Sequence, residues 1–176
     1  EGRWLMSCGT WEEEWLQVQL LCGRCGYVPR TAVTESVRET GEAFRRLPVP
    51  EQRKRLTETA LSYLGTPYRW GGKTSLGVDC SGLAQMTYLL NGWIIYRDAQ
   101  IKSGYPVRKI PLKDIQPGDL LYFPGHMAIY LGNQDYVHAT AASDRHCVTV
   151  NSLNPASPGY RSDLARSLTG AGSIYV

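Results

Sequence analysis

The sequence has no long hydrophobic run. Its 176 residues contain no stretch that approaches the roughly 20 consecutive apolar residues of a membrane-spanning helix, so we expect no transmembrane segment. The chain begins at Glu1 without a methionine, a basic segment or an apolar segment of the kind that export signals contain. We therefore expect a processed product or a cloned fragment, with any export signal removed from its N-terminal side.

The sequence also lacks a strong excess of charge of either sign. It has 19 basic and 16 acidic residues, which give a formal net charge of +3. Proteins that bind nucleic acid concentrate basic residues in a patch or stripe, so we expect no nucleic-acid partner. A weak attraction to an anionic polymer such as a cell wall is still compatible with this charge.

Cysteine and histidine are both scarce. Five cysteines are an odd number, which leaves at least one free thiol if the others pair. Cys22-Gly23-Arg24-Cys25 has the spacing of half a zinc site, but neither a second such pair nor a histidine pair at finger spacing follows it. We therefore interpret these two cysteines as flanking a tight hairpin turn, and we expect no metal and no cofactor.

Residues 1–32 have the pattern of short strands. Residues 15–20 alternate apolar and polar side chains, which is the period of a half-buried strand, and residues 27–29 form a second short strand. Short strands separated by glycines favour a small barrel. Residues 14–18 and 26–29 resemble the C-terminal part of a bacterial SH3 domain, so we expect a partial SH3-like segment. Residues 33–50 are predicted to be a linker with a helical turn around residues 36–44.

From residue 51 to residue 176 the pattern is that of a separate domain. Apolar residues at helical spacing predict an amphipathic helix over residues 51–64, which Gly65 ends. A second helix is predicted to begin just after Asp79 or Cys80 and to end at residues 91–92. Strands are then predicted over residues 120–123, 126–131, 136–139 and 148–150, with a hairpin turn at residues 132–135. Helices followed by antiparallel strands predict an α+β fold.

Cys80 is the candidate nucleophile because it stands where the second predicted helix begins. A thiol with an ordinary pKa of about 8.5 is a poor nucleophile, and a helix N-terminus can lower that pKa. The free backbone N–H groups of the first turn therefore favour a thiolate, and they can also bind a developing oxyanion. Gly82 leaves room for a substrate backbone. The alternative is that Cys80 is a buried structural cysteine.

A cysteine nucleophile also needs a base and a group that orients the base. His126 opens one predicted strand, and His138 lies on the next strand across the hairpin, so pairing of these strands brings the two rings together. We predict that His126 is the base and that His138 holds its other ring nitrogen. Either histidine alone would more often be structural. His146 fits no motif and is interpreted as a surface residue.

Several motifs in this part of the chain resemble those of the NlpC family of cell-wall cysteine peptidases. The resemblance covers about residues 51–151 and implies a papain-like α+β fold with Cys80 as nucleophile, His126 as base and His138 as the third polar residue. The motifs occur in the family's order: Pro67-Tyr68-Arg69-Trp70-Gly71-Gly72, Asp79-Cys80-Ser81-Gly82, Pro117-Gly118-Asp119-Leu120, Gly125-His126-Met127-Ala128-Ile129-Tyr130-Leu131-Gly132 and His138-Ala139.

The resemblance also implies a substrate, the bond between γ-D-glutamate and a diamino acid in peptidoglycan stem peptides. Tyr68 matches a tyrosine that lines the family's active site and can assist at the oxyanion. Asp79 matches a position that recognises a free N-terminal L-Ala in members with SH3 domains, although a simple helix N-cap is an equal alternative. Ser81 belongs to the same motif and is predicted to bind substrate. Ala99 departs from the family pattern, because a substrate-contacting serine often stands there.

The expected partners are peptidoglycan stem peptides or muropeptides, bound by a monomer that is secreted or located at the cell envelope. A cytoplasmic enzyme that recycles wall fragments is the alternative location. Two other functions stay open, namely an amidase or acyltransferase on a related scaffold and a non-catalytic wall-binding protein. Trp70 and Trp93 are interpreted as core residues. The basic side chains of Lys102, Arg108 and Lys109 are interpreted as solvated, with attraction of an acidic glycan-linked peptide as the alternative.

Overall fold

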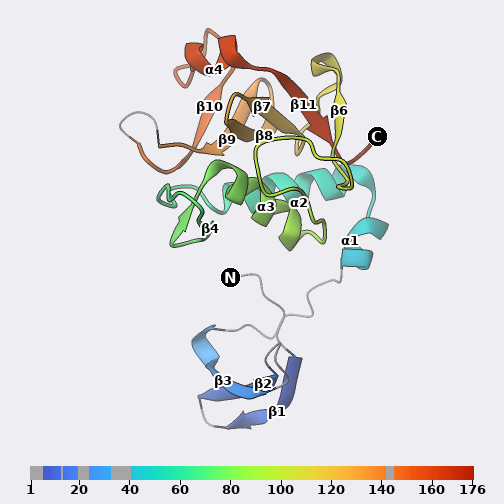
Figure 1. Cartoon of the computed structure of the whole chain (residues 1–176), viewed down its shortest axis with the longest axis vertical. Coiled ribbons are helices and arrows are strands. Elements are labelled where there is room, and N and C mark those ends of the chain that lie inside the picture. Colours follow the sequence, from blue (N-terminus) through green and yellow to red (C-terminus); the bar gives the residue numbers. More distant parts are fainter. Residues whose placement is uncertain (1–5, 13, 20–23, 33–40, 142–144) are drawn as a thin grey trace. The chain divides into compact units, whose positions relative to one another are not determined.

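The computed structural model describes residues 6–12, 14–19, 24–32, 41–141 and 145–176. The chain forms two compact units, Glu1–Glu39 and Thr40–Val176, and each is described by itself. In the first unit, three antiparallel strands pair in the order β1-β2-β3, and the short helix η1 follows them (Figure 1). Their bounds are Met6–Glu12 for β1, Trp15–Gln19 for β2, Cys25–Pro29 for β3 and Arg30–Ala32 for η1.

Strands β2 and β3 lie where the sequence predicts strands. The assignment of residues 1–32 to an SH3-like segment stays a prediction. The predicted turn between Cys22 and Cys25 lies partly outside the described residues, as do residues 33–40 of the predicted linker.

The second unit has an α+β architecture, as predicted. A six-stranded sheet lies between helices α2 and α3 on one face and helix α4 on the other (Figure 1). Neighbouring strands are all antiparallel, in the order β10-β9-β8-β7-β11-β6. These strands are Val148–Ser152 (β10), Asp135–Ala139 (β9), His126–Gly132 (β8), Leu120–Phe123 (β7), Gly170–Ser173 (β11) and Arg108–Ile110 (β6). The other elements are Gly41–Arg46 (α1), Val49–Leu61 (α2), Lys73–Thr74 (β4), Gly77–Val78 (β5), Cys80–Leu90 (α3), Leu112–Asp114 (η2) and Ser162–Ser167 (α4).

The hairpin between β8 and β9 brings the two predicted site histidines onto neighbouring strands. Gly132 pairs with Asp135, so the loop has two residues. These residues, Asn133 and Gln134, have φ values of 52° and 67°. Positive φ at both central positions is what a tight turn matched to the strand twist requires. The hairpin turn predicted at residues 132–135 is therefore confirmed.

Helix α2 begins two residues earlier and ends three residues earlier than the predicted 51–64. Pro50 occupies its first turn, where a missing N–H costs nothing. After Leu61 the chain tightens into single turns, with the N–H of Leu64 donating to the carbonyl of Leu61 at 3.1 Å. Gly65, at φ +80°, then ends the segment as predicted. Among the described residues, no helix is both long enough and apolar enough to cross a bilayer.

Alternation along the strands gives the sheet two apolar faces. Met127, Ile129 and Val137 pack against α2 and α3, whereas Ala128 and Tyr136 face the layer that contains α4. Burial on both faces explains why these strands read as nearly continuous apolar runs. Phe44 of α1 is also buried in the core, so the predicted linker over residues 33–50 includes a segment that packs on this unit.

A buried ion pair fastens α2 to the turn that precedes β7. Arg53 donates to the carboxylate of Asp119 at 2.9 Å and to the carbonyl of Pro117 at 2.8 Å. The guanidinium also lies 4.4 Å from the centre of the Tyr175 ring. Gly118, at φ +88°, makes the turn. The motif over residues 117–120 thus anchors the fold, and α3 packs against the same sheet.

Candidate functional site

Cys80 is the first residue of α3, as predicted. Asp79 caps this helix, because its carboxylate accepts a hydrogen bond from the N–H of Gly82 at 2.6 Å. The N-cap interpretation of Asp79 is therefore confirmed. Cys80 is buried, and the backbone N–H groups of Met127, Ser81 and Cys80 itself favour the ionised sulfur. Because Met127 directly follows His126 in the chain, the sulfur lies at the start of β8.

The pKa of the Cys80 thiol is raised above its ordinary value. Burial is the largest cause, and the negative charge of Asp79 adds to it, while the three backbone N–H groups act in the opposite direction. The backbone N–H groups at the helix start therefore act on the thiol pKa in the predicted direction, and burial acts against them.

The two predicted histidines are hydrogen-bonded to each other. Nε2 of His126 lies 2.8 Å from Nδ1 of His138, and the His138 side chain is fully buried. On its other side, Nε2 of His138 lies 2.9 Å from Oδ1 of Asn151 on β10. Sequence reasoning missed Asn151, because the predicted strand over residues 148–150 stops one residue before it. The signal that could have revealed Asn151 was the pairing register of that strand.

Burial lowers the pKa of both histidines. The pKa of His126 falls to about 3, with the neighbouring His138 as the second cause. The pKa of His138 falls to about 4, although the hydrogen bond with Asn151 acts to raise it. Arg161 lowers and Asp163 raises both values, and these two residues form an ion pair of 2.6 Å with each other. Both rings are neutral at neutral pH, and a neutral imidazole can accept a proton.

Arg97 joins Asp79 and Ser81 beside the start of α3. Its Nη2 donates to Asp79 Oδ2 at 2.7 Å, and its Nη1 donates to Ser81 Oγ at 2.6 Å. Burial raises the pKa of Asp79, but hydrogen bonds from Arg97 and from two backbone N–H groups outweigh it, so the net pKa is lowered. Asp79 is buried whereas the Arg97 side chain is 28% exposed, so the guanidinium is the accessible charge.

The loop over residues 67–72 packs directly against the start of α3. A Cβ atom on Gly82 would lie only 2.2 Å from the carbonyl oxygen of Gly72. The N–H of Gly71 donates to Asp79 Oδ2 at 2.7 Å, which ties the loop to the helix cap. The motifs over residues 67–72 and 79–82 therefore depend on each other. Gly82 leaves room for the carbonyl oxygen of Gly72, and the N–H of Gly71 donates to Asp79.

Tyr68 lies on this loop and is half-buried. Burial raises its pKa, the charges of Cys80 and Asp79 raise it further, and Arg97 lowers it. The phenol is thus within electrostatic reach of the thiol. The role of Tyr68 as a residue that lines the site stays a prediction.

Three other sequence interpretations have different outcomes. Trp70 is 85% exposed, so its interpretation as a core residue is wrong, because the loop carries its side chain away from the core. Trp93 is partly buried against the core, and His146 is exposed, as predicted. Within the described ranges, no three or more His, Cys, Asp or Glu side chains gather in a way that could hold a metal ion.

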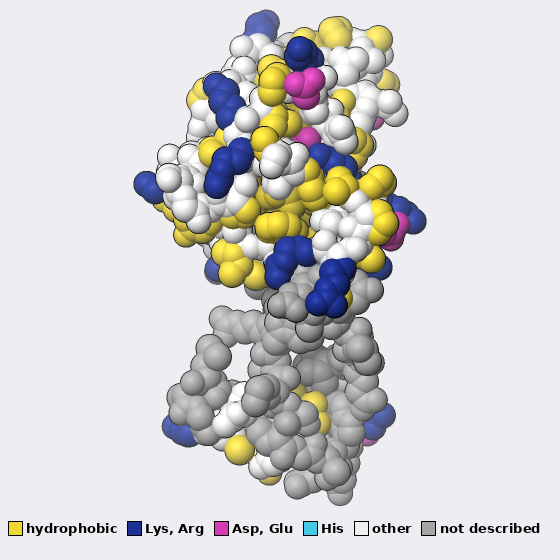
Figure 2. Space-filling model, turned by 90° about the vertical axis from the view of Figure 1, so that its right-hand side faces the viewer, with side chains coloured by type: hydrophobic (Ala, Val, Ile, Leu, Met, Phe, Trp, Pro, Cys, Tyr) yellow, Lys and Arg dark blue, Asp and Glu magenta, His cyan; other side chains and the backbone are white. Residues whose placement is uncertain are grey.

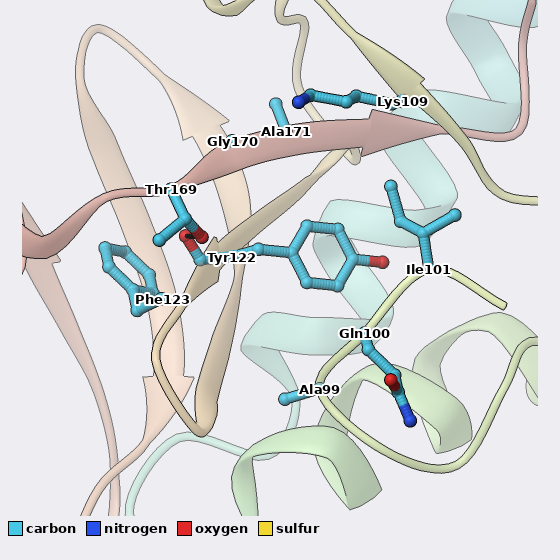
Figure 3. Close-up of a pocket in the computed structure, with 9 residues that line it drawn as sticks. All are labelled: Ala99, Gln100, Ile101, Lys109, Tyr122, Phe123, Thr169, Gly170 and Ala171. Carbon is cyan, nitrogen blue, oxygen red and sulfur yellow. Dashed lines mark hydrogen bonds between the residues drawn. The ribbon is translucent and has the colours of Figure 1, made fainter.

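A pocket of about 250 Å³ is lined by residues of β6, β7 and β11 and of the segment 99–101 (Figure 3). Phe123 lines it and also contacts His126, with 5.7 Å between the ring centres. Ala99, two residues after Arg97, also lines the pocket (Figure 3). Ile101 and Tyr122 make much of the wall apolar, and among the described residues that line the pocket Lys109 alone carries a charge. Lys109 is exposed, as predicted, but it also borders this pocket.

The chain matches known proteins over this same region. A sequence model of the NlpC/P60 family matches residues 65–164. Dipeptidyl-peptidase 6 of Lysinibacillus sphaericus is 47% identical over 164 residues, which cover 92% of this chain and 57% of that protein. The γ-D-glutamyl-L-lysine dipeptidyl-peptidase of Bacillus subtilis strain 168 is 35% identical over 116 residues, or 56% of this chain and 38% of that protein. The chain thus spans about half the length or less of these two relatives.

Solved structures show the same fold. An NlpC/P60 family protein from Bacillus cereus ATCC 10987 superposes with a TM-score of 0.64 at 27% identity, over 92% of this chain and 51% of that one. The NlpC/p60 domain of the peptidoglycan hydrolase SagA superposes with a TM-score of 0.55 at 32% identity, over 69% of this chain and 97% of that one.

Proposed function

The chain belongs to the NlpC/P60 family, and from that premise we propose that it is a cysteine peptidase that hydrolyses the γ-D-glutamyl–diamino acid bond of peptidoglycan stem peptides. The observation that carries the proposal is Cys80 at the start of α3, beside the hydrogen-bonded pair of His126 and His138. The names of two relatives, a dipeptidyl-peptidase and a γ-D-glutamyl-L-lysine dipeptidyl-peptidase, support this class of bond.

In the first half of the reaction, the sulfur of Cys80 attacks the γ-glutamyl carbonyl carbon while His126 takes the thiol proton. General-base assistance is needed because burial raises the pKa of the Cys80 thiol. The oxyanion that forms is stabilised by backbone N–H groups at the start of α3 and by the hydroxyl of Tyr68. The carbon–nitrogen bond then breaks, and His126 gives its proton to the leaving amine of the diamino acid.

In the second half, water attacks the thioester carbonyl and His126 accepts a proton from that water. The carbon–sulfur bond breaks, the sulfur regains its proton from His126, and the peptide leaves with a free γ-carboxylate. Throughout both halves, His138 keeps the ring of His126 in place through the 2.8 Å hydrogen bond. No charged third residue is required for this, because His138 is neutral at neutral pH.

Arg97 is the group that we expect to select a γ-linked glutamate. A γ-linkage leaves the α-carboxylate of glutamate free, and a guanidinium binds a carboxylate through two parallel hydrogen bonds. Arg97 is held by Asp79 and Ser81, yet part of its side chain is exposed. Ser81 shares the Arg97 contact and is proposed to bind substrate with it. Ala99 supplies no hydroxyl to this subsite.

A requirement for a free N-terminal L-Ala is a finer part of the proposal. It depends on Asp79, whose carboxylate already accepts hydrogen bonds from Arg97, Gly71 and Gly82. An ammonium group that binds Asp79 would therefore have to share Oδ2 with Arg97. Comparison of peptides with a free and an acetylated N-terminus tests this requirement separately from the cleavage itself.

The proposed function is tested by incubating the protein with L-Ala-γ-D-Glu-meso-diaminopimelate and identifying the products by mass spectrometry. We expect L-Ala-γ-D-Glu with a free γ-carboxylate together with free diaminopimelate. If Asp79 binds the free amine, the acetylated peptide is expected to react more slowly. If Asp79 serves only as the helix cap, both peptides are expected to react equally fast. If neither peptide is cleaved, the proposal is contradicted.

Two alternative functions predict other products. An amidase or acyltransferase would leave this bond intact or transfer the acyl group to an acceptor other than water. A non-catalytic wall-binding protein would retain the peptide without any product. We propose action on stem peptides outside the cytoplasm or at the cell envelope, as the names of wall-acting relatives such as the probable peptidoglycan endopeptidase LytE of Bacillus subtilis strain 168 support. A cytoplasmic recycling role is the alternative.

The pocket next to Phe123 leads to a prediction about the diamino acid. We infer that this pocket receives its side chain, because meso-diaminopimelate carries a carboxylate that lysine lacks and Lys109 is the charge on the pocket rim. Figure 2 shows a face of this unit on which Lys and Arg side chains lie around a central hydrophobic area, with few acidic ones. Lys109→Glu is expected to lower the preference for diaminopimelate over lysine by about fivefold, since exposed ion pairs contribute up to about 1 kcal/mol.

The measurement is the ratio of kcat/KM for the two tripeptides at low and high salt. Lys113→Glu, an exposed position outside the pocket lining with the same change of charge, is the matched control. The shift in ratio should be confined to Lys109→Glu and should shrink at high salt, because screening weakens exposed charge interactions. An equal shift in both variants would mean that net charge, and not the pocket, sets the preference.

A further inference from the structure

Asn151 ends a chain of hydrogen bonds that runs to the candidate base. Its Nδ2 donates to the carbonyl of Gly159 at 2.9 Å, and its Oδ1 lies 2.9 Å from Nε2 of His138. The carbonyl of Gly159 is itself held, because it also accepts from the N–H of Ser152 at 2.9 Å. Asn151 therefore touches neither the sulfur nor the substrate position, but it contacts the residue that contacts His126.

The orientation of the Asn151 amide follows from its two neighbours. A carbonyl oxygen such as that of Gly159 can only accept hydrogen bonds, so the amino group of Asn151 must face it. The opposite orientation would place two oxygens against each other and leave the amide without this bond. The oxygen of Asn151 therefore faces His138, and the hydrogen-bond network determines the assignment.

The tautomers of both histidines follow in turn. Because Asn151 presents an acceptor, His138 must carry its proton on Nε2 and donate it. Nδ1 of neutral His138 is then unprotonated and can only accept, so His126 must donate to it from Nε2. In neutral His126 the remaining atom, Nδ1, carries the lone pair. That atom is the one available to take the proton of Cys80.

We propose that Asn151 is a positioning residue that fixes both histidine tautomers, so that Nδ1 of His126 is the proton-accepting atom. The proposal rests on the proposed cysteine-peptidase function. Without Asn151, His138 is free to carry its proton on Nδ1 and to accept with Nε2. His126 then accepts with Nε2 and turns an N–H toward the sulfur, which is the wrong tautomer for a base.

The charged side chains near the two histidine rings do not fix the tautomers, which leaves this role to Asn151. Facing the two rings are Arg161 and Asp163, which precede and begin α4 and act on the ring protons in opposite directions. They form two hydrogen bonds with each other, at 2.8 and 2.6 Å. Their charges therefore largely cancel at the rings, and the polar contact that distinguishes the two nitrogens of His138 is the one with Asn151.

The tautomers can be read directly in protein labelled with ¹⁵N at histidine. The chain has three histidines, and exposed His146 serves as an internal reference. In the wild-type protein at neutral pH, we expect proton–nitrogen correlation spectra to show Nε2–H with unprotonated Nδ1 for both His126 and His138. In Asn151→Ala we expect a mixture of tautomers. A protonated Nδ1 on His126 in the wild-type protein would overturn the proposal whether or not the protein cleaves the peptide.

Kinetics supply the second readout. Asn151→Ala is expected to lower kcat about 10- to 100-fold with little change in KM, a loss of the size found when the outer hydrogen-bond partner of a metal-binding histidine is removed. Asn154→Ala is the matched control, because that amide lies three residues further on and accepts from Ala156 instead. It should keep wild-type kcat. Equal losses in both variants would indicate a general effect on this loop and overturn the proposal.

Asn151→Asp supplies a test of rescue. A carboxylate also accepts from Nε2 of His138, so the tautomer is expected to be retained at neutral pH. Its second oxygen cannot donate to the carbonyl of Gly159, so kcat is expected to lie between those of wild type and Asn151→Ala. The negative charge raises the pKa of His138, and protonated His138 cannot accept from His126. The acidic limb of the kcat profile is therefore expected to move to higher pH than in wild type, where both histidine pKa values are low. An unmoved limb, or a loss as large as in Asn151→Ala, would contradict the proposal.

Discussion

Replacing Cys80 with alanine is expected to lower kcat/KM for L-Ala-γ-D-Glu-meso-diaminopimelate by at least about 10⁴-fold, as the removal of a covalent nucleophile does in other hydrolases. Alanine keeps the backbone N–H groups, the helix cap and nearly the same volume, but it offers no atom that can attack a carbonyl. The measurement is product formation over time, with the melting temperature recorded for both proteins. We expect the fold to be retained, because the cap of α3 depends on Asp79 and Gly82 and not on the sulfur.

The matched control for this change is Cys147→Ala. Cys147 is another thiol of the same unit and is only partly buried, so its loss should leave kcat/KM within about twofold, as for most substitutions away from a functional site. Acid quenching of the wild-type reaction should also trap the dipeptide on Cys80 as a thioester, detectable by mass. Substantial hydrolysis by Cys80→Ala would contradict thiol chemistry and leave only the fold resemblance.

Gly82→Ala is expected to be the most damaging single-methyl change near the site. In an ordinary helix interior, replacement of glycine by alanine stabilises by about 1 kcal/mol. Here the new Cβ would lie 2.2 Å from the carbonyl oxygen of Gly72 and 2.9 Å from Asp79 Oδ1. Neither the backbone nor the cap can yield without moving the start of α3. We therefore expect a loss of about 2 kcal/mol in the free energy of unfolding, within the range for overpacked sites.

The same change is expected to lower kcat by about 100-fold, because displacement of a nucleophile by about 1 Å has an effect of that size. Urea unfolding and peptide hydrolysis measure the two consequences. Gly170→Ala is the control for stability alone, since its Cβ would meet only the flexible end of Lys109 at 3.7 Å. If Gly82→Ala were as stable and active as wild type, the tight contact between the 67–72 loop and α3 would be refuted.

The elements that the sequence predicts well are those with strong apolar patterns. Strands β7, β8 and β9 were predicted to within a residue, because their side chains are buried on both faces. Strand β11 was not predicted, since residues 170–173 contain two glycines, an alanine and a serine and therefore no alternation. Its glycines serve close packing instead: a Cβ on Gly172 would lie 2.8 Å from Val107. Such a requirement comes from the neighbours and not from the segment.

The residues of the candidate site also divide into those that the sequence predicts and those that it does not. Cys80, His126 and His138 were predictable because a helix start and two paired strands bring them together. Arg97 was not, because it lies in a segment without helix or strand, where no periodicity indicates which way a side chain points. The raised pKa of Cys80 was also out of reach, since its largest cause is burial by residues distant in the sequence. Desolvation depends on the packed fold, whereas a helix start can be read locally.

Strand β11 has a consequence for how the protein is made. It follows every other strand in the described sequence, yet it pairs with β7 on one side and β6 on the other. A nascent chain therefore cannot complete its sheet until residues 170–173 have left the ribosome, and β7 offers an open edge until then. Pairing across such long sequence separations is slow. We expect peptide-cleaving competence to arise only after residues 170–173 have emerged, when Cys80 and both histidines have long been exposed to solvent.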